Sequence, residues 1–193
     1  MSSLYLVAGL GNPDSEYEGT RHNIGFPCVD ELADRLDAGK FKRSRKHSAL
    51  VAEGRDGDER LVLAKPQTYM NLSGRSVASL MRFYKVPLER VIVVHDELDL
   101  PFGVVRVKLG GGTAGHNGLG SVAEAIGVGF ARVRVGIGRP PGRKDPVDFV
   151  LEPFAKREQL EVPAIVDRAA DAVLAVVRDG VGAAQTEFNR REG

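Results

Sequence analysis

The sequence predicts an α/β protein, built as a single globular domain with helices on both faces of a mixed β-sheet. Three observations predict this class: short apolar runs that end at glycine or proline, amphipathic segments at helical spacing, and the alternation of the two along the chain. A chain of 193 residues is long enough for one well-formed core and short for two. Because no repeat or low-complexity linker divides it, we expect residues 1–193 to fold as one domain.

The first half of the chain alternates a strand, a helix, a hairpin and a second helix. The apolar run at 4–10 ends at glycines and a proline, which is typical of a buried strand. Apolar residues at helical spacing predict a helix over 23–36. Two apolar runs within 48–66 flank an Asp-Gly turn signal and predict a hairpin. A helix is expected over 73–86, where the apolar residues share one face and a proline follows.

The second half repeats the alternation. The run at 90–98 is strongly apolar and becomes polar only at its end, which predicts a buried strand. Apolar and polar residues alternate over 103–109 and 130–138, as half-buried strands require. A glycine-rich loop leads into a predicted helix at 119–127, and a long helical stretch over 156–179 ends at a glycine. The order of the strands in the sheet cannot be deduced from these patterns.

The composition is that of an ordinary globular protein, with 42% hydrophobic residues, 27% charged residues and a net charge of +1. No apolar run approaches the ~20 residues that cross a bilayer, so we expect no membrane span. The opening residues contain no basic leader, and the single cysteine, Cys28, cannot form an internal disulfide. These features favour a cytoplasmic protein.

One segment departs from this neutral charge balance. The stretch "KFKRSRKH" at 40–47 holds five lysines and arginines and no acidic residue. Such a run is either a solvated loop or a patch that contacts phosphates, because clustered cations gain affinity for a polyanion by releasing counterions. Charge alone leaves both interpretations open.

Four polar loops follow or flank the predicted strands, where ligand sites of α/β folds collect. They hold three of the four histidines of the chain, namely His22, His95 and His116. This concentration of chemically useful side chains is the main functional signal. The loops read "GLGNPDSEYEGTRHN", "KPQTYMNLSG", "HDELDLPFG" and "LGGGTAGHNG".

Three kinds of chemistry fit these loops poorly. The segment "GLGNPD" lacks the third glycine of a dinucleotide-binding fingerprint, since Asp14 stands there. Histidines and carboxylates suffice for a metal site, but no ligand spacing marks one, and the neighbouring asparagines are poor zinc ligands. Ser73 lies outside a G-x-S-x-G elbow and is better explained as a helix N-cap, while Cys28 is better explained as a small buried side chain.

Hydrolysis by an activated water fits better, because it needs only a base, a carboxylate to orient the base, and donors for the oxyanion. His22 is the candidate base, since the pKa of histidine lies nearest neutral pH, and Asp96 is the candidate carboxylate. Asparagine amides can hold a water and stabilise an oxyanion, which nominates Asn12, Asn71 and Asn117.

These motifs together resemble those of bacterial peptidyl-tRNA hydrolase, from residue 9 to about residue 153. The matching segments are "GLGNP", "TRHNIGF", "KPQTYMNLSG", "HDELDLPFG", "GGGTAGHNGLGS" and "RVRVGIGRP", in that order. The resemblance implies an esterase that releases the peptide from the terminal ribose of tRNA. It also implies one twisted mixed sheet among helices, peptidyl-tRNA as the partner, no metal or other cofactor, and a monomer.

The resemblance also assigns roles by position. His22 stands at the place of the catalytic base, Asp96 at that of its carboxylate partner, and Asn71 at that of a residue contacting the attacking water. Lys108 and Arg134 match cations that hold a tRNA phosphate. The remaining matches are residues that bind the substrate or shape the cleft: Asn12, Tyr17, Tyr69, Met70, His116 and Asn117.

The sequence departs from the family pattern at one position, and several roles and functions stay open. Ala114 stands where a glycine is expected, so the loop is strained if that position needs a positive φ. His95 ends an apolar strand and is expected to be structural, whereas Asn71 and Asn117 adjoin helix starts and are candidate caps as well. Two other functions remain open: a non-catalytic module that binds tRNA or a nucleotide, and a hydrolase of small N-acyl esters.

Overall fold

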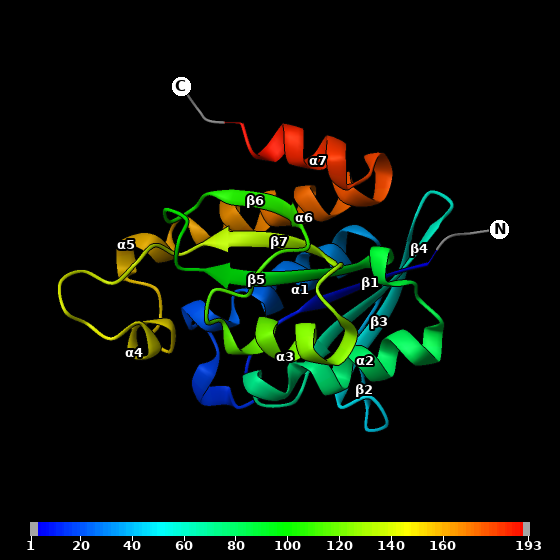
Figure 1. The fold of residues 1–193 in the computed structure, drawn as a ribbon, viewed down its shortest axis with the longest axis horizontal. Coiled ribbons are helices and arrows are strands. Elements are labelled where there is room, and N and C mark those ends of the chain that lie inside the picture. Colours follow the sequence, from blue (N-terminus) through cyan, green and yellow to red (C-terminus); the bar gives the residue numbers. More distant parts are fainter. Residues whose placement is uncertain (1–3, 191–193) are drawn as a thin grey trace.

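The computed structural model describes residues 4–190, which form one seven-stranded sheet with helices on both faces (Figure 1). Strand β1 runs parallel to β4 and β5, and β5 runs parallel to β7, whereas the outer pairs are antiparallel. The predicted mixed sheet is thereby confirmed; residues 1–3 and 191–193 of the predicted domain lie outside the described residues. In spatial order the strands are β2 (Lys42–Ser44), β3 (Ala49–Asp56), β4 (Glu59–Pro66), β1 (Leu4–Gly9), β5 (Val91–Glu97), β7 (Ala131–Gly136) and β6 (Val105–Leu109).

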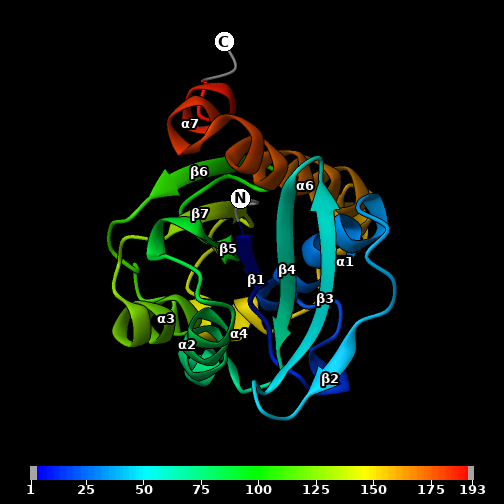
Figure 2. The ribbon, with the colours of Figure 1, turned by 90° about the vertical axis from the view of Figure 1, so that its right-hand side faces the viewer.

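Two layers of helices enclose the sheet. One face is covered by α1 (Gly25–Arg35) and α6 (Val162–Asp179), the other by α2 (Ser73–Tyr84) and α3 (Asn117–Ile126) (Figure 2). Alternate residues of the buried strand β5 serve the two layers, because successive side chains of a strand point to opposite faces. Among the described residues, none of the helices is long and apolar enough to cross a membrane.

The remaining helices are short and peripheral. They are α4 (Pro146–Val150), α5 (Lys156–Gln159) and α7 (Val181–Phe188), together with four 3₁₀ turns, η1 (Ser15–Tyr17), η2 (Arg21–Asn23), η3 (Met70–Leu72) and η4 (Leu88–Arg90). Helix α7 packs beside β6 and α6 at the top of Figure 1. The turns η2 and η3 matter most, because each joins a central strand to the helix that follows it.

Several local expectations were wrong or incomplete. The predicted helical stretch at 156–179 is broken, because α6 begins anew at Val162 with a proline in its first turn. The Ser73 hydroxyl caps nothing; it donates to the Met70 carbonyl at 2.7 Å, since α2 continues directly from η3. Helix α3 begins at Asn117, and the residue whose side chain caps it is His116. Strand β2 and helices α4 and α7 were not predicted.

Two glycines bring α1 against the sheet. A Cβ at Gly9 would stand 2.2 Å from the Gly25 carbonyl oxygen, and a Cβ at Gly25 would stand 2.5 Å from the Leu10 nitrogen. Only glycine allows the backbones to approach this closely. The glycines of "GLGNP" and "HNIGF" therefore seat the start of α1 on the end of β1, and this contact places η2 with its His22 beside β5.

Candidate active site

The carboxyl ends of the central parallel strands meet at one cavity of about 320 Å³. The helix that follows β1, α1, covers one face of the sheet, and the helix that follows the neighbouring strand β4, α2, covers the other face. Open α/β sheets bind ligands at such a switch point. Ten of the predicted or nearby residues line the cavity on its polar and aromatic sides: Asn12, Tyr17, His22, Tyr69, Met70, Asn71, Asp96, Glu97, His116 and Asn117. The loops nominated by the sequence thus converge.

The imidazole of His22 is held by the carboxylate of Asp96. Its Nδ1 lies 2.9 Å from one oxygen of Asp96 and 3.1 Å from the other, and both side chains are buried. Because a carboxylate only accepts hydrogen bonds, Nδ1 carries the proton and the lone pair of the neutral ring is on Nε2. Nε2 has no partner among the described residues, so it is available to a molecule in the cavity.

A second imidazole shares the same carboxylate. His116 Nε2 lies 2.7 Å from an oxygen of Asp96, and the other ring nitrogen, Nδ1, accepts the backbone N–H of Leu119 at 3.0 Å. Accepting that N–H requires Nδ1 to be unprotonated, so Nε2 must be the nitrogen that donates to Asp96. Since both ring nitrogens are occupied, His116 positions the carboxylate and caps α3, and it has no free nitrogen for a substrate.

The two imidazoles keep the carboxyl ionised. Complete burial alone would raise the pKa of Asp96, but His116 and His22 beside it hold the pKa well below its ordinary range. His95, directly before it, donates from Nδ1 to the Asp96 carbonyl at 2.8 Å. Burial, followed by the neighbouring His116, lowers the pKa of His95 to about 3, so this ring is a neutral structural group as expected.

Hydrogen bonds to neighbouring residues fix the orientation of Asn12 and leave its side-chain Nδ2 without a partner among the described residues. Its side-chain oxygen accepts the Met70 N–H at 2.8 Å, which leaves Nδ2 to face the cavity. Its backbone is clamped by Asn23, which accepts the Asn12 N–H at 2.8 Å and donates to the Asn12 carbonyl at 2.9 Å. The second residue of the "HN" pair at 22–23 is therefore a buried brace that sequence reasoning did not identify.

The other two asparagines are exposed at the mouth of the cavity. Asn71 belongs to η3 and Asn117 is the first residue of α3, and neither side chain is committed to a hydrogen bond among the described residues. Neither acts as a helix cap, contrary to one expectation. Their amides are therefore free to bind a water or a polar substrate. Tyr17, Tyr69 and Met70 form an apolar wall beside them.

The chain is similar to known proteins over nearly its whole length. The family model described as peptidyl-tRNA hydrolase matches residues 6–193. The chain belongs to the peptidyl-tRNA hydrolase family. The family and the enzyme class predicted from the motifs are thereby confirmed.

Individual members of the family agree in length and fold. A peptidyl-tRNA hydrolase from Nocardia farcinica is 56% identical over 185 residues, which are 95% of each chain. One from Mycobacterium ulcerans is 56% identical over 190 residues, 98% of this chain and 99% of the relative. A crystal structure of the Acinetobacter baumannii peptidyl-tRNA hydrolase superposes with a TM-score of 0.90 at 39% identity and covers 98% of this chain and 96% of that one.

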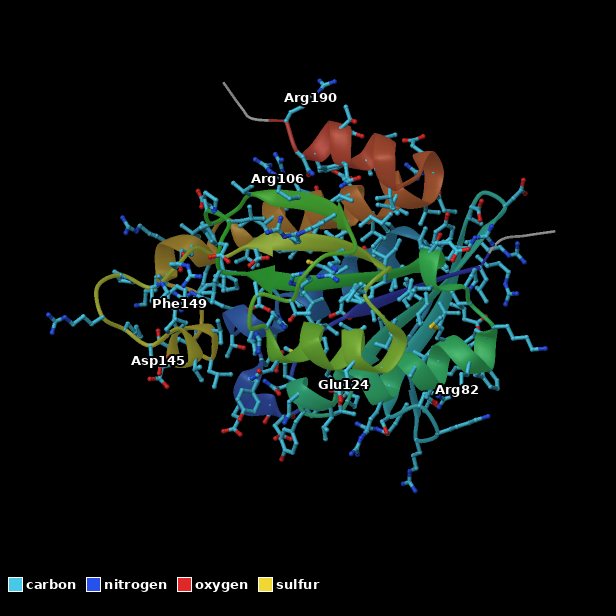
Figure 3. All side chains as sticks on the ribbon, viewed as in Figure 1. Arg82, Arg106, Glu124, Asp145, Phe149 and Arg190 are labelled. Carbon is cyan, nitrogen blue, oxygen red and sulfur yellow. The ribbon has the colours of Figure 1, made fainter. Side chains whose placement is uncertain are left out.

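Helix α4 forms part of the cavity wall, and no sequence pattern predicted this helix. It contributes Val147 and Val150 to the lining. Arg21 holds this wall in place: its guanidinium lies 3.8 Å from the centre of the Phe149 ring and donates to the Phe149 carbonyl at 3.1 Å. It also pairs with Glu158 at 3.1 Å. In this member of the family, the residue before His22 therefore ties α4 to the candidate base (Figure 3 labels Phe149).

The two predicted phosphate-binding cations differ in their surroundings. Lys108 on β6 and Arg134 on β7 share one face of the sheet as diagonal neighbours. Arg134 pairs with Glu97 at 3.1 Å, whereas Lys108 forms no ion pair among the described residues. Between them, the buried Arg132 donates to the carbonyls of Gly111 and Gly112 and so fastens the glycine-rich loop, a role that sequence reasoning missed.

Ala114 adopts the conformation that its family resemblance put in question. Its φ is 48°, within the left-handed region that favours glycine. The side chain lies at the edge of the cavity, two residues before the His116 cap. The loop thus keeps the shape that a glycine would allow and stores some backbone strain, on the order of 1–2 kcal/mol.

His22, Asp96 and His116 are also the residues whose types suit a metal ion, with potential ligand atoms all within 4.8 Å of one another. The contacts of Asp96 to the two imidazoles are 2.9 Å and 2.7 Å. Ligands about 2.0–2.1 Å from a tetrahedral zinc stand roughly 3.3 Å apart, so the rings would have to separate to admit one. The observed spacing is that of hydrogen bonds, which both rings are protonated to make.

Proposed function

We propose that this chain hydrolyses the ester between a peptide and the 3′-terminal ribose of tRNA, with His22 activating a water molecule. The observation that carries the proposal is the His22–Asp96 contact, which leaves Nε2 of a buried imidazole facing a cavity lined by asparagine amides. Membership of the peptidyl-tRNA hydrolase family supports the substrate. The roles of the individual residues rest on geometry.

In the proposed reaction, Nε2 of His22 takes a proton from a water held by Asn71, and the water oxygen attacks the ester carbonyl carbon. The carbonyl oxygen becomes an oxyanion, which the Nδ2 donor of Asn12 stabilises; one such donor is worth about 2.7–4 kcal/mol. When the intermediate collapses, the C–O bond to the ribose breaks and the His22 imidazolium returns its proton to the leaving oxygen. The products are the peptide carboxylic acid and tRNA with a free hydroxyl.

The charge on Asp96 serves two purposes in this scheme. It fixes the His22 tautomer with Nε2 unprotonated, and it stabilises the imidazolium once the proton has moved. Because its pKa is held low by two imidazoles, Asp96 remains anionic throughout the neutral range. His116 keeps the carboxylate from turning away, since it occupies one oxygen and is itself anchored to α3.

The asparagines offer a basis for selecting peptidyl over unblocked aminoacyl esters. Asn117 lies at the cavity mouth, where its amide can pair with the first peptide bond of the substrate. An unblocked aminoacyl ester carries an ammonium instead, which cannot accept a hydrogen bond and is costly to strip of water. We therefore infer that the asparagine amides select substrates with an acylated nitrogen by hydrogen bonding to the first peptide bond.

The remaining parts of the proposal concern the tRNA and the setting. Lys108 and Arg134 are proposed to hold a phosphate near the 3′ end, which requires Arg134 to share its guanidinium with Glu97. We also propose that the protein acts as a monomer in the cytoplasm. The single cysteine, which is buried, supports the cytoplasmic setting, and the monomer is what the family resemblance implies.

A turnover assay separates this proposal from its alternatives. Purified protein is given an N-acetyl-aminoacyl-tRNA, the same tRNA with an unblocked amino acid, and a small N-acetyl amino acid ester. We expect rapid release of the acetylated amino acid from the first substrate alone. Binding of tRNA without release would support a non-catalytic module, and equal cleavage of the small ester would support a general N-acyl esterase.

A further inference from the structure

A group of exposed cations lies on the edge of the sheet that is remote from Lys108 and Arg134. Four of them come from β2 and the turn that follows it, and two come from the exposed side of α2. We call this surface the basic face and define it as Lys42, Arg43, Arg45, Lys46, Arg75 and Arg82.

Specific contacts join the two segments into one surface. His47 Nδ1 lies 2.7 Å from the Ser79 hydroxyl, and Lys46 Nζ lies 4.4 Å from the centre of the Phe83 ring. On α2, positions 75, 79, 82 and 83 follow the spacing of one helix face. The turn after β2 therefore rests on the side of α2 that carries both arginines. Figures 1 and 2 show β2 and α2 in the lower part of the molecule, and Figure 3 labels Arg82.

The charges of the basic face are not neutralised by the protein. None of its side chains forms an ion pair with a residue in the described range 4–190, and its backbone segments contain no acidic residue between Lys40 and His47. By contrast, Lys65 on β4 is paired with Asp30, and Arg35 on α1 is paired with three carboxylates. Six uncompensated cations on one surface are suited to a polyanion.

The distance of the basic face from the cavity and from Lys108 determines which phosphates of a bound tRNA it can contact. Helix α2 starts two residues after Asn71 and rises about 1.5 Å per residue, so Arg82 stands roughly 14 Å from the beginning of the helix. Strands β2 and β6 are the opposite edges of the sheet, six strand spacings or roughly 29 Å apart. The cations on β2 and Lys108 therefore cannot contact the same phosphate.

We propose that the basic face binds the sugar–phosphate backbone of the tRNA body, at a stretch separate from the 3′ end that enters the cavity. The inference rests on the proposed function, because it takes peptidyl-tRNA as the substrate. A tRNA whose acylated end lies at Asn71 has the rest of its backbone outside the cavity, and α2 leads from there to the six cations. The turn at 45–48 acts as a platform that His47 and Phe83 fasten to α2.

The experiment compares a variant of the basic face with a variant of equal charge change elsewhere. The test variant carries Lys42→Gln, Arg43→Gln and Arg45→Gln; the control carries Lys156→Gln, Arg157→Gln and Arg190→Gln, which are exposed on other elements. Both are assayed with N-acetyl-aminoacyl-tRNA and with the same acyl group on a short 3′-terminal oligonucleotide. Thermal unfolding checks that both remain folded.

For the test variant we expect KM for the whole tRNA to rise roughly tenfold near physiological salt, with kcat unchanged. The slope of log KM against log salt should weaken by about 2–3, since each of the three lost phosphate contacts contributes about 0.7 on a single strand and about 0.9 on a duplex. KM for the oligonucleotide ester should not change. An unchanged KM for the whole tRNA, an equal rise for the oligonucleotide, or an equal rise in the control would each overturn the proposal.

Failure of this inference is distinguishable from failure of the proposed function. Retention of uncharged tRNA on a filter measures binding without any turnover, so it is informative even for a protein that cleaves no ester. We expect the test variant to bind uncharged tRNA roughly tenfold more weakly than the control. Equal binding by the two variants would reject the basic face whatever the outcome of the hydrolysis assay.

Discussion

The two His-Asn pairs of this chain, at 22–23 and 116–117, use the same two residues in opposite ways. In the first pair the histidine presents a free Nε2 to the cavity, and the asparagine is a buried brace of Asn12. In the second pair the histidine is the brace, with both nitrogens engaged, and the asparagine faces the cavity. The role of each residue follows from what its remaining polar atoms contact.

The difference arises from the backbone on which each pair is placed. His22 lies in a 3₁₀ turn before α1, where no helix N–H points at its ring. His116 is the N-cap of α3, so the helix itself uses one of its nitrogens. A free ring nitrogen can accept a proton from water, whereas a capping nitrogen gives up a structural bond if it does. Because only His22 has a free ring nitrogen, we infer that His22 is the general base.

Removing each histidine in turn tests whether His22 and His116 have different roles, and it should give the largest effects. His22→Ala should lower kcat/KM for N-acetyl-aminoacyl-tRNA by about 10³–10⁴, because the general base is lost. His116→Ala should lower it by only about tenfold and should cost roughly 1 kcal/mol of unfolding free energy, because a helix cap is lost. Steady-state kinetics and chemical denaturation measure the two effects. Equal losses of activity in the two variants would contradict the assignment of His22 as the base and His116 as a positioning residue.

Asp96→Asn tests the carboxylate that joins the two pairs. Asparagine loses the negative charge and places an NH2 donor where one carboxylate oxygen accepted, so it can no longer hold both imidazoles as Asp96 does. We expect kcat/KM to fall by at least about 100-fold while the far-ultraviolet circular dichroism spectrum stays that of the folded protein. Activity within a few-fold of the original would show that the orientation of His22 does not depend on this contact.

The two asparagines are expected to separate stability from activity. Asn23→Ala leaves the buried N–H and C=O of Asn12 unpaired and should cost about 2–4 kcal/mol of unfolding free energy. Asn117→Ala should leave stability within about 0.5 kcal/mol and reduce kcat/KM by about 10–100-fold. Urea unfolding and kinetics on the same preparations make the comparison. The account is contradicted if Asn117→Ala is the less stable of the two.

His95 supplies a smaller, pH-dependent contrast with its two neighbours. Its pKa is lowered to about 3 by burial and then by His116, whereas in the unfolded chain it takes a proton near pH 6.5. The unfolded state therefore binds more protons below about pH 6.5, and the stability of the folded state falls as pH drops toward about 3. His95→Asn should flatten the fall of Tm between about pH 6.5 and pH 4. Parallel curves for the two proteins would refute it.

The smallest expected effect concerns the loop that leads to His116. Ala114→Gly relieves a left-handed alanine, which costs on the order of 1–2 kcal/mol, but adds the chain entropy of glycine, about 0.5–1 kcal/mol. The net gain in unfolding free energy should be between about 0 and 1.5 kcal/mol. Activity should be unchanged, since no contact of Asp96 or His116 is altered. A loss of stability would mean that the loop is not strained.

Much of the fold could be predicted because its central elements are regular. The strand at 4–9 is a largely apolar run, the strand at 91–97 is apolar over its first four residues, and α2 shows a clear apolar face. Strand β2, with three residues, and helix α4, with five, are too short to show a period. Their conformations are set by tertiary contacts: β2 pairs with β3 across a short turn, and α4 is held by Arg21, which lies 128 residues before Phe149.

The candidate site could be predicted as a set of residues but not as a set of contacts. Asn12, His22 and Asn71 follow the parallel strands β1 and β4, and Asp96 lies at the end of β5, so their meeting was foreseeable from the parallel sheet. Asn117 follows the antiparallel edge strand β6 and was nominated from its glycine-rich loop. The braces could not be foreseen, because Asn23, Arg21 and Arg132 act through backbone atoms whose positions depend on the folded structure. For the same reason the sequence could not show that Arg134 is already paired with Glu97.

The pH dependence of kcat/KM, measured for the original protein and for His22→Ala, shows whether His22 is the general base. If His22 is the base, the original protein should lose activity about tenfold per pH unit on the acid side, because protonation of Nε2 removes the lone pair that activates water. The residual activity of the variant should lack this acid limb and rise only with hydroxide. An acid limb of the same midpoint in both proteins would contradict the account, because another group would then be the base.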